Sequence, residues 1–187
     1  MATHDHFLKL DGIDGESQDS KFKGQIDVLS FGYQANQGGT SHVGGGGGKG
    51  RVALGDFVIN KNIDKASPAL FQYCCSGQPI TKAVFTSRKA GKDQQPFYVV
   101  TMTDVLVSSH QTGNPAGGNS PAPANSGAGS GKGPVSATPA LSDDWVANET
   151  ITLNYSTISI AYSEQAADGS VKGAITKGWD AKQNKVI

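Results

Sequence analysis

The segment PFYVVTMTDVLVSS, residues 96–109, decides the fold class of this 187-residue chain. Its side chains are mostly β-branched or aromatic, a composition that favours strands. Apolar groups fall on both of its faces, so a sheet with one solvent-facing side would leave some of them uncovered. The segment therefore predicts a long strand inside a larger β-structure.

Further strands are predicted on either side of this segment. They cover residues 7–10, 23–35, 51–62, 79–89 and 145–162, and a polar hairpin anchored by Trp179 covers 170–186. In 23–35, positions 26, 28 and 30 are expected on one face and positions 29, 31 and 33 on the other. The chain thus alternates strands with turns over most of its length.

The last long strand changes its apolar phase part-way. Its large apolar residues stand at odd positions 151, 153 and 155 and then at even positions 158, 160 and 162. A strict period of two cannot place all six on one face. A bulge near Ser156 and Thr157 would restore one inward face and bend the strand, as a barrel requires. The alternative is that both faces are covered.

One short helix is predicted between two of the strands. Ser67 is expected to cap it, Pro68 suits its first position and Gly77 ends it. Cys74 and Cys75 lie side by side within it. Neighbouring cysteines form neither a disulfide framework nor a zinc site, so we expect both to be reduced and buried.

Two segments, at about 36–50 and 111–142, are expected to be flexible loops. The first contains Gly44, Gly45, Gly46, Gly47 and Gly48, a run that can form neither a helix nor a packed strand. The second holds five of the eight prolines and too few large apolar groups to offset the entropy of ordering. Long loops usually contact another molecule, so we expect the glycine run to meet a partner.

The composition argues against several classes of partner. The 16 basic residues balance 16 acidic ones, so no nucleic-acid partner is predicted. No apolar stretch reaches the 18 residues that a membrane span needs. The N-terminus lacks a basic region followed by an apolar one, so we expect folding in the cytoplasm and, if the protein is exported, a route without a signal peptide.

No catalytic, cofactor or metal site is predicted. His4 and His6 lie in the N-terminal segment, His42 lies in the glycine-rich loop and His110 opens the second loop. Preorganised catalysis needs side chains on rigid supports, and these four are mostly on the least rigid parts.

Other candidate sites also lack the features that their chemistry needs. Ser108 and Ser109 precede His110, but no nucleophile elbow surrounds them. The glycine run leads to a lysine that neither serine nor threonine follows, and a strand comes next, so a phosphate loop is not expected. Asp27 and Asp104 lie mid-strand, where ion pairing is expected.

Together these features predict one domain, residues 1–187, of the mainly β class. We expect an antiparallel β-barrel with one short α-helix and long extended loops. A barrel has only one inside, so apolar groups on the outer faces indicate contacts with other subunits.

The chain resembles the haemolysin-coregulated protein family, Hcp, the tube subunit of bacterial type VI secretion. The motifs that carry the resemblance occur in the family's order over nearly the whole chain. They are FLKLDGIDGES (7–17), IDVL (26–29), GGGGG (44–48), IDKASP (63–68), CCSG (74–77), RKAG (88–91), DVLVSS (104–109), TLNY (152–155) and GW (178–179). Two departures are Phe31 and Tyr33 in place of paired tryptophans, and a longer segment at 111–142.

The resemblance implies a hexameric ring that stacks into a tube. The tube would have a contractile sheath around it, a spike protein at its tip and small secreted effectors inside it. It would be assembled in the cytoplasm and expelled. The glycine run at 44–48 would then meet an adjacent subunit or ring, and Ser30 and Gly32 would face the lumen.

Two alternatives remain beside the tube subunit. One is an effector-binding chaperone or adaptor ring, which capture of small toxins by intact rings would support. The other is a small β-barrel enzyme. A monomer whose activity disappears on replacing His42, Asp104 or Ser109 would support that alternative.

Overall fold

The computed structural model describes residues 4–38, 51–89, 94–113, 147–164 and 173–187. Within these ranges the chain forms twelve strands and one helix: β1 (His4–Leu10), β2 (Ile26–Val28), β3 (Ser30–Gly32), β4 (Ala35–Asn36), β5 (Ala53–Leu54), β6 (Phe57–Asn62), α1 (Ser67–Ser76), β7 (Ile80–Lys89), β8 (Pro96–Thr112), β9 (Asn148–Asn154), β10 (Thr157–Tyr162), β11 (Ile175–Asp180) and β12 (Lys185–Val186). The predicted mainly β fold with one short helix is confirmed.

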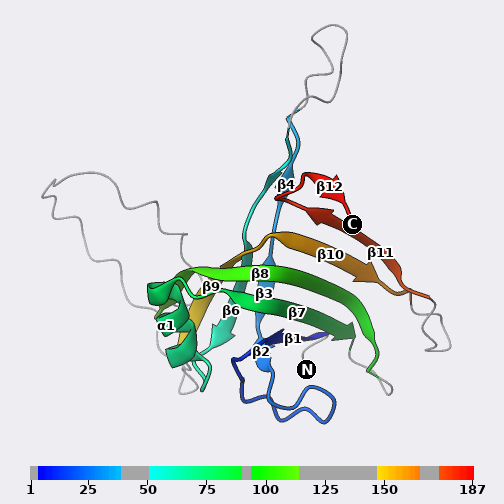
Figure 1. Ribbon diagram of the computed structural model, residues 1–187. Coiled ribbons are helices and arrows are strands. Elements are labelled where there is room, and N and C mark those ends of the chain that lie inside the picture. Colours follow the sequence, from blue (N-terminus) through cyan, green and yellow to red (C-terminus); the bar gives the residue numbers. More distant parts are fainter. Residues whose placement is uncertain (1–3, 39–50, 90–93, 114–146, 165–172) are drawn as a thin grey trace, which may run out of the picture.

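The 17-residue strand β8 organises the sheets. One edge of it pairs with β7; the other pairs first with β10, from Tyr98 to Thr103, and then with β9, from Leu106 onward. All these pairings are antiparallel. Asp104, at the change of partner, has a positive φ of 49°. Figure 1 shows β8 curving across the molecule towards α1, so one strand belongs to two sheets.

The two sheets wrap around one core and meet at a seam beside Leu29. One sheet has the order β12-β11-β10-β8-β7-β1-β2, while β9, β6 and β3 continue from the second half of β8. The backbone N–H of Leu29, between β2 and β3, donates to the Asn60 carbonyl of β6 at 2.7 Å. This hydrogen bond, rather than a continuous ladder, joins the two ends of the barrel.

The predicted continuous strand at 23–35 is wrong. The chain forms three short strands there, because it leaves one sheet at Val28 and enters the other at Ser30. Val28 is buried, Leu29 is 52% exposed and Phe31 packs against the core. Positions 26 and 28 thus face inward, but so does position 31, so the inward face changes parity at the seam.

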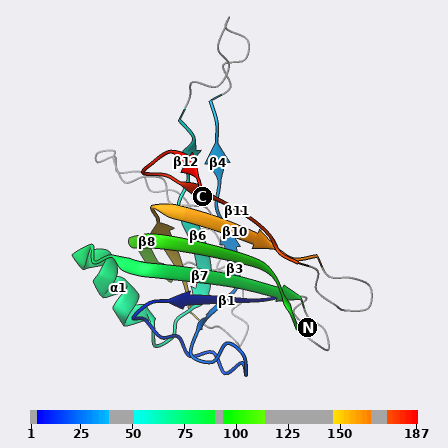
Figure 2. The same ribbon diagram turned by 45° about the vertical axis from the view of Figure 1, so that its right-hand side comes forward.

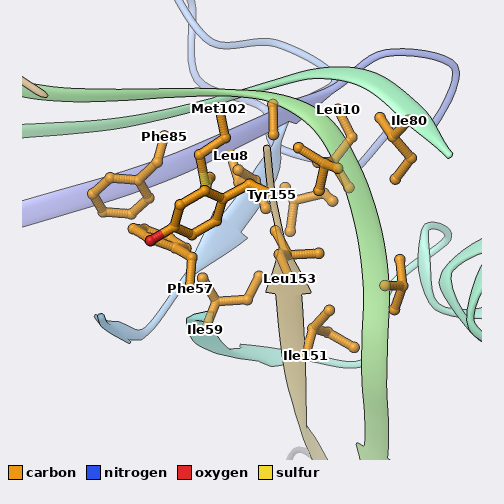
Figure 3. Close-up of a cluster of buried hydrophobic side chains, with 14 of the residues drawn as sticks. Leu8, Leu10, Phe57, Ile59, Ile80, Phe85, Met102, Ile151, Leu153 and Tyr155 are labelled. Atoms are coloured by element: carbon orange, nitrogen blue, oxygen red, sulfur yellow. The ribbon is translucent and has the colours of Figure 1, made fainter. Parts of the chain in front are cut away.

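The core lies between the sheets and is almost wholly apolar. Figure 3 shows side chains from β1, β6, β8 and β9 pointing towards one another. Its fully buried larger members are Leu8, Ile26, Phe57, Ile59, Leu70, Ile80, Phe85, Met102, Ile151 and Leu153. Phe31 lies 4.2 Å from Phe85 between ring centres, which fills the space beside the seam.

The predicted irregularity near Ser156 and Thr157 is present, but it is a break between two strands, β9 and β10, rather than a bulge within one strand. Tyr155 and Ser156 separate the two strands, and both the odd-numbered Leu153 and the even-numbered Ile158 are buried. The Ser156 N–H donates to the Thr103 carbonyl at 3.0 Å, which keeps the break attached to β8. The change of parity therefore keeps the large apolar side chains of both strands on the inward face, which a barrel requires.

Helix α1 lies at the end of β8, as Figure 1 shows. Gly77 ends it in the left-handed region, with φ 65°, as predicted. The predicted Ser67 cap is wrong, because Ala66 occupies the cap position and its N–H donates to the Asp64 carboxylate at 2.9 Å. The predicted burial of the thiols is also wrong: Cys74 is half-buried and Cys75 is exposed. Both are free.

The segment at 11–25 covers part of the outer face of β1 and β7. Phe22 stacks on Phe7 with 4.5 Å between ring centres and 5° between planes. Arg88 lies over both rings and bonds to the carboxylates of Asp5 and Asp19. Its side chain is only 4% exposed. One buried cation therefore fastens this segment to the sheet.

Candidate interaction surfaces

Ser30 and Gly32 lie on the outward face of β3, where both are exposed. The Asn60 side-chain amide N–H donates to the Ser30 hydroxyl at 2.7 Å, and the Thr150 hydroxyl donates to the side-chain oxygen Oδ1 of Asn60 at 2.6 Å. The three residues are register partners on β3, β6 and β9. They form a neutral hydrogen-bonded row across three strands.

This row belongs to a larger surface, which we call the outer polar face. It consists of Ser30, Gly32, Val58, Asn60, Thr150 and Thr152, which alternate with buried residues of the core. Asp56 lies just before β6 and accepts hydrogen bonds from Ser108 at 2.6 Å and from Asn154 at 2.7 Å. The six residues of the outer polar face carry hydroxyl and amide groups, the apolar Val58 and no formal charge, while the Asp56 carboxylate lies at their edge.

A two-stranded arm leaves the body of the protein beside this face. Figures 1 and 2 show β4 rising away from the two sheets, and Ala35 and Asn36 pair with Leu54 and Ala53 of β5. The predicted contact residues Gly44, Gly45, Gly46, Gly47 and Gly48 lie outside the described residues, between these two strands.

An apolar pocket of about 220 Å³ lies at the root of the arm. Tyr33 and Leu54 line it from the arm, and Ile158, Ile160 and Trp179 line it from β10 and β11. The hydroxyls of Tyr33 and Tyr98 contact each other close by. Packing at the arm's base therefore depends on aromatic and branched side chains from distant parts of the chain.

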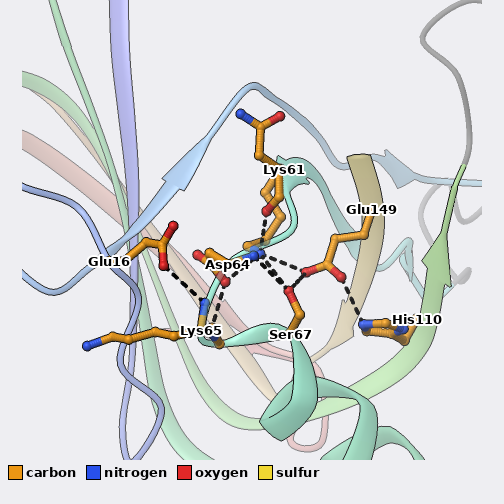
Figure 4. A network of polar contacts seen from close by, with 9 residues as sticks. Glu16, Lys61, Asp64, Lys65, Ser67, His110 and Glu149 are labelled. Carbon is orange, nitrogen blue, oxygen red and sulfur yellow. Dashed lines mark hydrogen bonds and ion pairs between the residues drawn. The ribbon is translucent and has the colours of Figure 1, made fainter. Parts of the chain in front are cut away.

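A buried charge network joins α1 to the sheets. The Lys61 ammonium lies 2.7 Å from carboxylate oxygens of both Asp64 and Glu149, and Lys61 and Glu149 are fully buried. The Ser67 hydroxyl donates to Glu149 at 2.8 Å. The other carboxylate oxygen of Glu149 lies 3.1 Å from Nε2 of His110. Figure 4 shows this set converging from β6, α1, β8 and β9.

The comparisons with known proteins agree with this architecture. The family model described as "Type VI secretion system effector, Hcp" matches residues 7–162. The chain belongs to the Hcp family. It is 35% identical over 182 residues to Protein hcp1 of Pseudomonas aeruginosa, with 96% of each chain covered.

Solved structures of Hcp proteins share the fold. Hcp1 from Salmonella typhimurium is 32% identical with a TM-score of 0.70, and all of each chain is covered. A structure described as a type six secretion system protein is 28% identical, with a TM-score of 0.78 over 98% of this chain and 99% of the other. The resemblance read from the sequence motifs is thus confirmed.

The residues considered for catalysis in this Hcp chain have separate partners. Ser108 donates to Asp56, whereas His110 lies against Glu149. Asp104 pairs with Lys182 at 3.0 Å, and this hydrogen bond lowers the pKa of the Asp104 carboxyl. His42 lies outside the described residues. In the parts of the chain that the structure describes, no group of three His, Cys, Asp or Glu side chains is placed to hold a metal ion, and no helix could cross a membrane.

Sequence reasoning missed the buried network, although a signal for it existed. Lys61 shares the odd-numbered face of β6 with the buried Phe57 and Ile59. Glu149 likewise shares the inward face of β9 with Ile151. Opposite charges at inward positions of two strands can pair, but their pairing across 88 residues requires the fold to be known.

Proposed function

We propose that this Hcp family protein is a structural subunit of the type VI secretion inner tube. Six copies form a ring, rings stack into a hollow tube, and the expelled tube carries effectors. The observation that carries the proposal is the match over 96% of both this chain and Protein hcp1. The barrel with its projecting arm supports it, because a subunit that contacts neighbours needs surface beyond its own core.

The outer polar face is suited to line the lumen. Its hydroxyls and amides are already engaged in a row through Ser30, Asn60 and Thr150, and no formal charge would hold a passing protein strongly. The backbone of Gly32 is open, because an added Cβ would meet nothing within 4 Å. These features support a surface that accepts varied cargo.

The arm is suited to contact the adjacent subunit or ring through the segment at 44–48. We expect Gly46→Trp to reduce ring mass while the far-ultraviolet spectrum of the barrel is unchanged. Rings of unaltered mass and stability would contradict this role. Arg51→Ala, at the arm's base, is a suitable second variant for the same measurement. The Arg51 guanidinium donates a hydrogen bond to the Ala181 carbonyl within the same subunit.

Partners follow from membership of a tube. They are further copies of the chain, a spike protein, contractile sheath proteins and small secreted effectors. Assembly in the cytoplasm and release without a signal peptide complete the proposal. The exposed row at Ser30 also favours a second function, in which the ring selects and protects effectors as a chaperone.

Light scattering on a sizing column tests the proposal first. A hexamer of this 19.3 kDa chain would have a mass of about 116 kDa. A monomer at all micromolar concentrations would contradict the tube subunit. If rings form, capture of small effectors by intact rings would support the chaperone function. Rings that stack without binding effectors would favour a purely structural function.

A further inference from the structure

A further pocket lies where the outer polar face meets the root of the arm. Its volume is about 330 Å³, at the lower end of the range of about 300–1,000 Å³ that is typical of ligand sites. That size suits one side chain of another molecule rather than a folded element. We call it the arm-edge pocket, and its lining residues are Gly32, Tyr33, Gln34, Gly55, Asp56 and Val58.

Asp56 supplies the one formal charge among these six residues. The Ser108 hydroxyl donates to Oδ2 of Asp56 at 2.6 Å, and the Asn154 side-chain amide donates to Oδ1 at 2.7 Å. A carboxylate has about four acceptor sites, so these two hydrogen bonds fix its direction and leave further acceptor capacity. The half-buried Asp56 is therefore a preoriented anion in the wall of the pocket.

The cations nearest to the arm-edge pocket are engaged with other groups. Arg51 and Lys182 line the adjoining surface. The Arg51 guanidinium donates to the Ala181 carbonyl, and the Lys182 ammonium pairs with Asp104 at 3.0 Å. Asp56 takes part in none of the ion pairs among the described residues. A half-buried carboxylate without a counter-ion favours a cationic partner.

The rest of the wall suits the stem of a long basic side chain. The Tyr33 ring is held against Phe57, with 5.7 Å between ring centres and 18° between planes, and Val58 is half-buried. A side-chain cation is attracted to an aromatic face, and its alkyl stem packs on apolar groups. Gly32 leaves the space open, because an added Cβ would meet nothing within 4 Å.

We propose that the arm-edge pocket binds a basic side chain of another protein. The cation pairs with Asp56, and the stem packs on Tyr33 and Val58. That this protein is a carried effector rests on the proposed tube function, because the pocket adjoins the face that is suited to line the lumen. The neutral outer polar face then admits varied cargo, while the pocket retains cargo that presents an exposed arginine or lysine.

Binding of blocked peptides to the intact protein tests the pocket. The probes are acetyl-Ala-Arg-Ala-amide and the same peptide with glutamine in place of arginine, followed through the methyl resonances of Val58. We expect the arginine peptide to shift these resonances saturably, to bind about fivefold more tightly than the glutamine peptide and to lose affinity as salt rises. Equal binding of the two peptides would overturn the proposal.

Two variants separate the charge of the pocket from its space. Asp56→Asn removes the anion and should weaken binding of the arginine peptide by about fivefold. Gly32→Leu keeps the anion but fills the open space, so it should weaken the same binding. Asp27→Asn, which removes an exposed carboxylate on β2, is the matched control and should bind as the wild type does. Wild-type affinity in either folded variant of the pocket would overturn the proposal.

The mass of the protein in the same samples distinguishes this proposal from the tube subunit. A monomer that binds the arginine peptide through Asp56 would support the pocket and contradict the tube subunit. Hexamers that bind the peptide would support both. Hexamers that do not bind it would overturn the pocket while the tube subunit stands.

Discussion

The guanidinium carbon of Arg88 lies 4.9 Å from the centre of the Phe7 ring. The two residues occupy neighbouring antiparallel strands, β7 and β1, and the cation is also bonded to Asp5 and Asp19. A planar guanidinium can lay its flat face on a ring while its fork of N–H donors reaches two carboxylates, a geometry that a compact ammonium does not reproduce. The attachment of the segment at 11–25 therefore depends on arginine specifically.

Arg88→Lys should lower the free energy of unfolding by about 1–3 kcal/mol, because the lysine keeps the charge but loses the fork of hydrogen bonds. Urea denaturation measures the change. Lys82→Arg, at an exposed position of the same strand, is the matched control and should have little effect. Equal stability of the Arg88→Lys and wild-type proteins would show that the stacking and the fork contribute nothing.

The Arg88 cluster should also shape stability in acid. The hydrogen bond from Arg88 is the main cause that lowers the pKa of Asp19 below its ordinary 3.8, against the opposing effect of burial. The unfolded chain therefore takes up this proton at higher pH than the folded one. The contribution of Asp19 is present above about pH 4 and is lost as pH falls through its folded pKa.

Denaturation midpoints at about pH 5 and about pH 2.5 test this effect. Asp19→Asn should lose less stability than the wild type between these two values. Asp14→Asn, an exposed carboxylate in the same segment, should retain the wild-type acid sensitivity. Identical slopes for the Asp19→Asn and wild-type proteins would refute the linkage.

The Tyr33 and Tyr98 hydroxyls should stabilise the base of the arm jointly. Burial, followed by the contact with Tyr33, raises the pKa of Tyr98. In a double-mutant cycle, Tyr33→Phe and Tyr98→Phe should show a coupling energy of about 0.5–1.5 kcal/mol. Tyr162→Phe, at an exposed position, should add independently to either. Strict additivity of Tyr33→Phe and Tyr98→Phe would mean that the contact between the two hydroxyls contributes no coupling energy.

Substitution by alanine should lower the free energy of unfolding at Gly15 but not at Gly32. A Cβ at Gly15 would lie 2.3 Å from the Gln25 carbonyl oxygen, whereas one at Gly32 would meet nothing within 4 Å. We expect Gly15→Ala to cost about 2 kcal/mol or more in thermal or urea unfolding, and Gly32→Ala to be close to neutral. A tolerated Gly15→Ala would mean that the turn at 11–25 can move as a whole.

A charge at Ser30 should affect cargo without affecting assembly. Ser30→Asp places a carboxylate on the outer polar face, where no formal charge exists, so effector capture by purified rings should fall severalfold while ring mass is unchanged. Thr81→Asp, an exposed position on β7, is the matched control. Unchanged capture by Ser30→Asp rings would argue that this face does not line the lumen.

The sequence predicted those elements whose signal is local. β7 and β8 follow from runs of β-branched residues, the end of α1 follows from Gly77, and the break near Ser156 follows from a change of apolar phase. Each of these signals lies within a few residues of the feature that it predicts, so tertiary structure has little opportunity to override it.

Other features depend on partners far along the chain. The split of the strand at 23–35 occurs because Leu29 finds Asn60 of the other sheet. The Ser67 hydroxyl does not cap the helix because it donates a hydrogen bond to the Glu149 carboxylate. Lys61 can be buried because its ammonium pairs with the same carboxylate. Among the candidate site residues, Ser30 and Gly32 are exposed as the lumen hypothesis requires, but their exposure alone does not identify a partner.

The double pairing of β8 has a consequence for how the protein is made. One edge of β8 pairs with β7, which is synthesised before it. The other edge pairs with β9 and β10, which are synthesised later and begin at Asn148 and Thr157. Until at least 36 further residues beyond Thr112 have been synthesised, a 17-residue strand has one unpaired side. Unpaired strand edges recruit other chains, so the nascent subunit passes through an aggregation-prone intermediate that persists until β9 and β10, which end at Tyr162, have been synthesised.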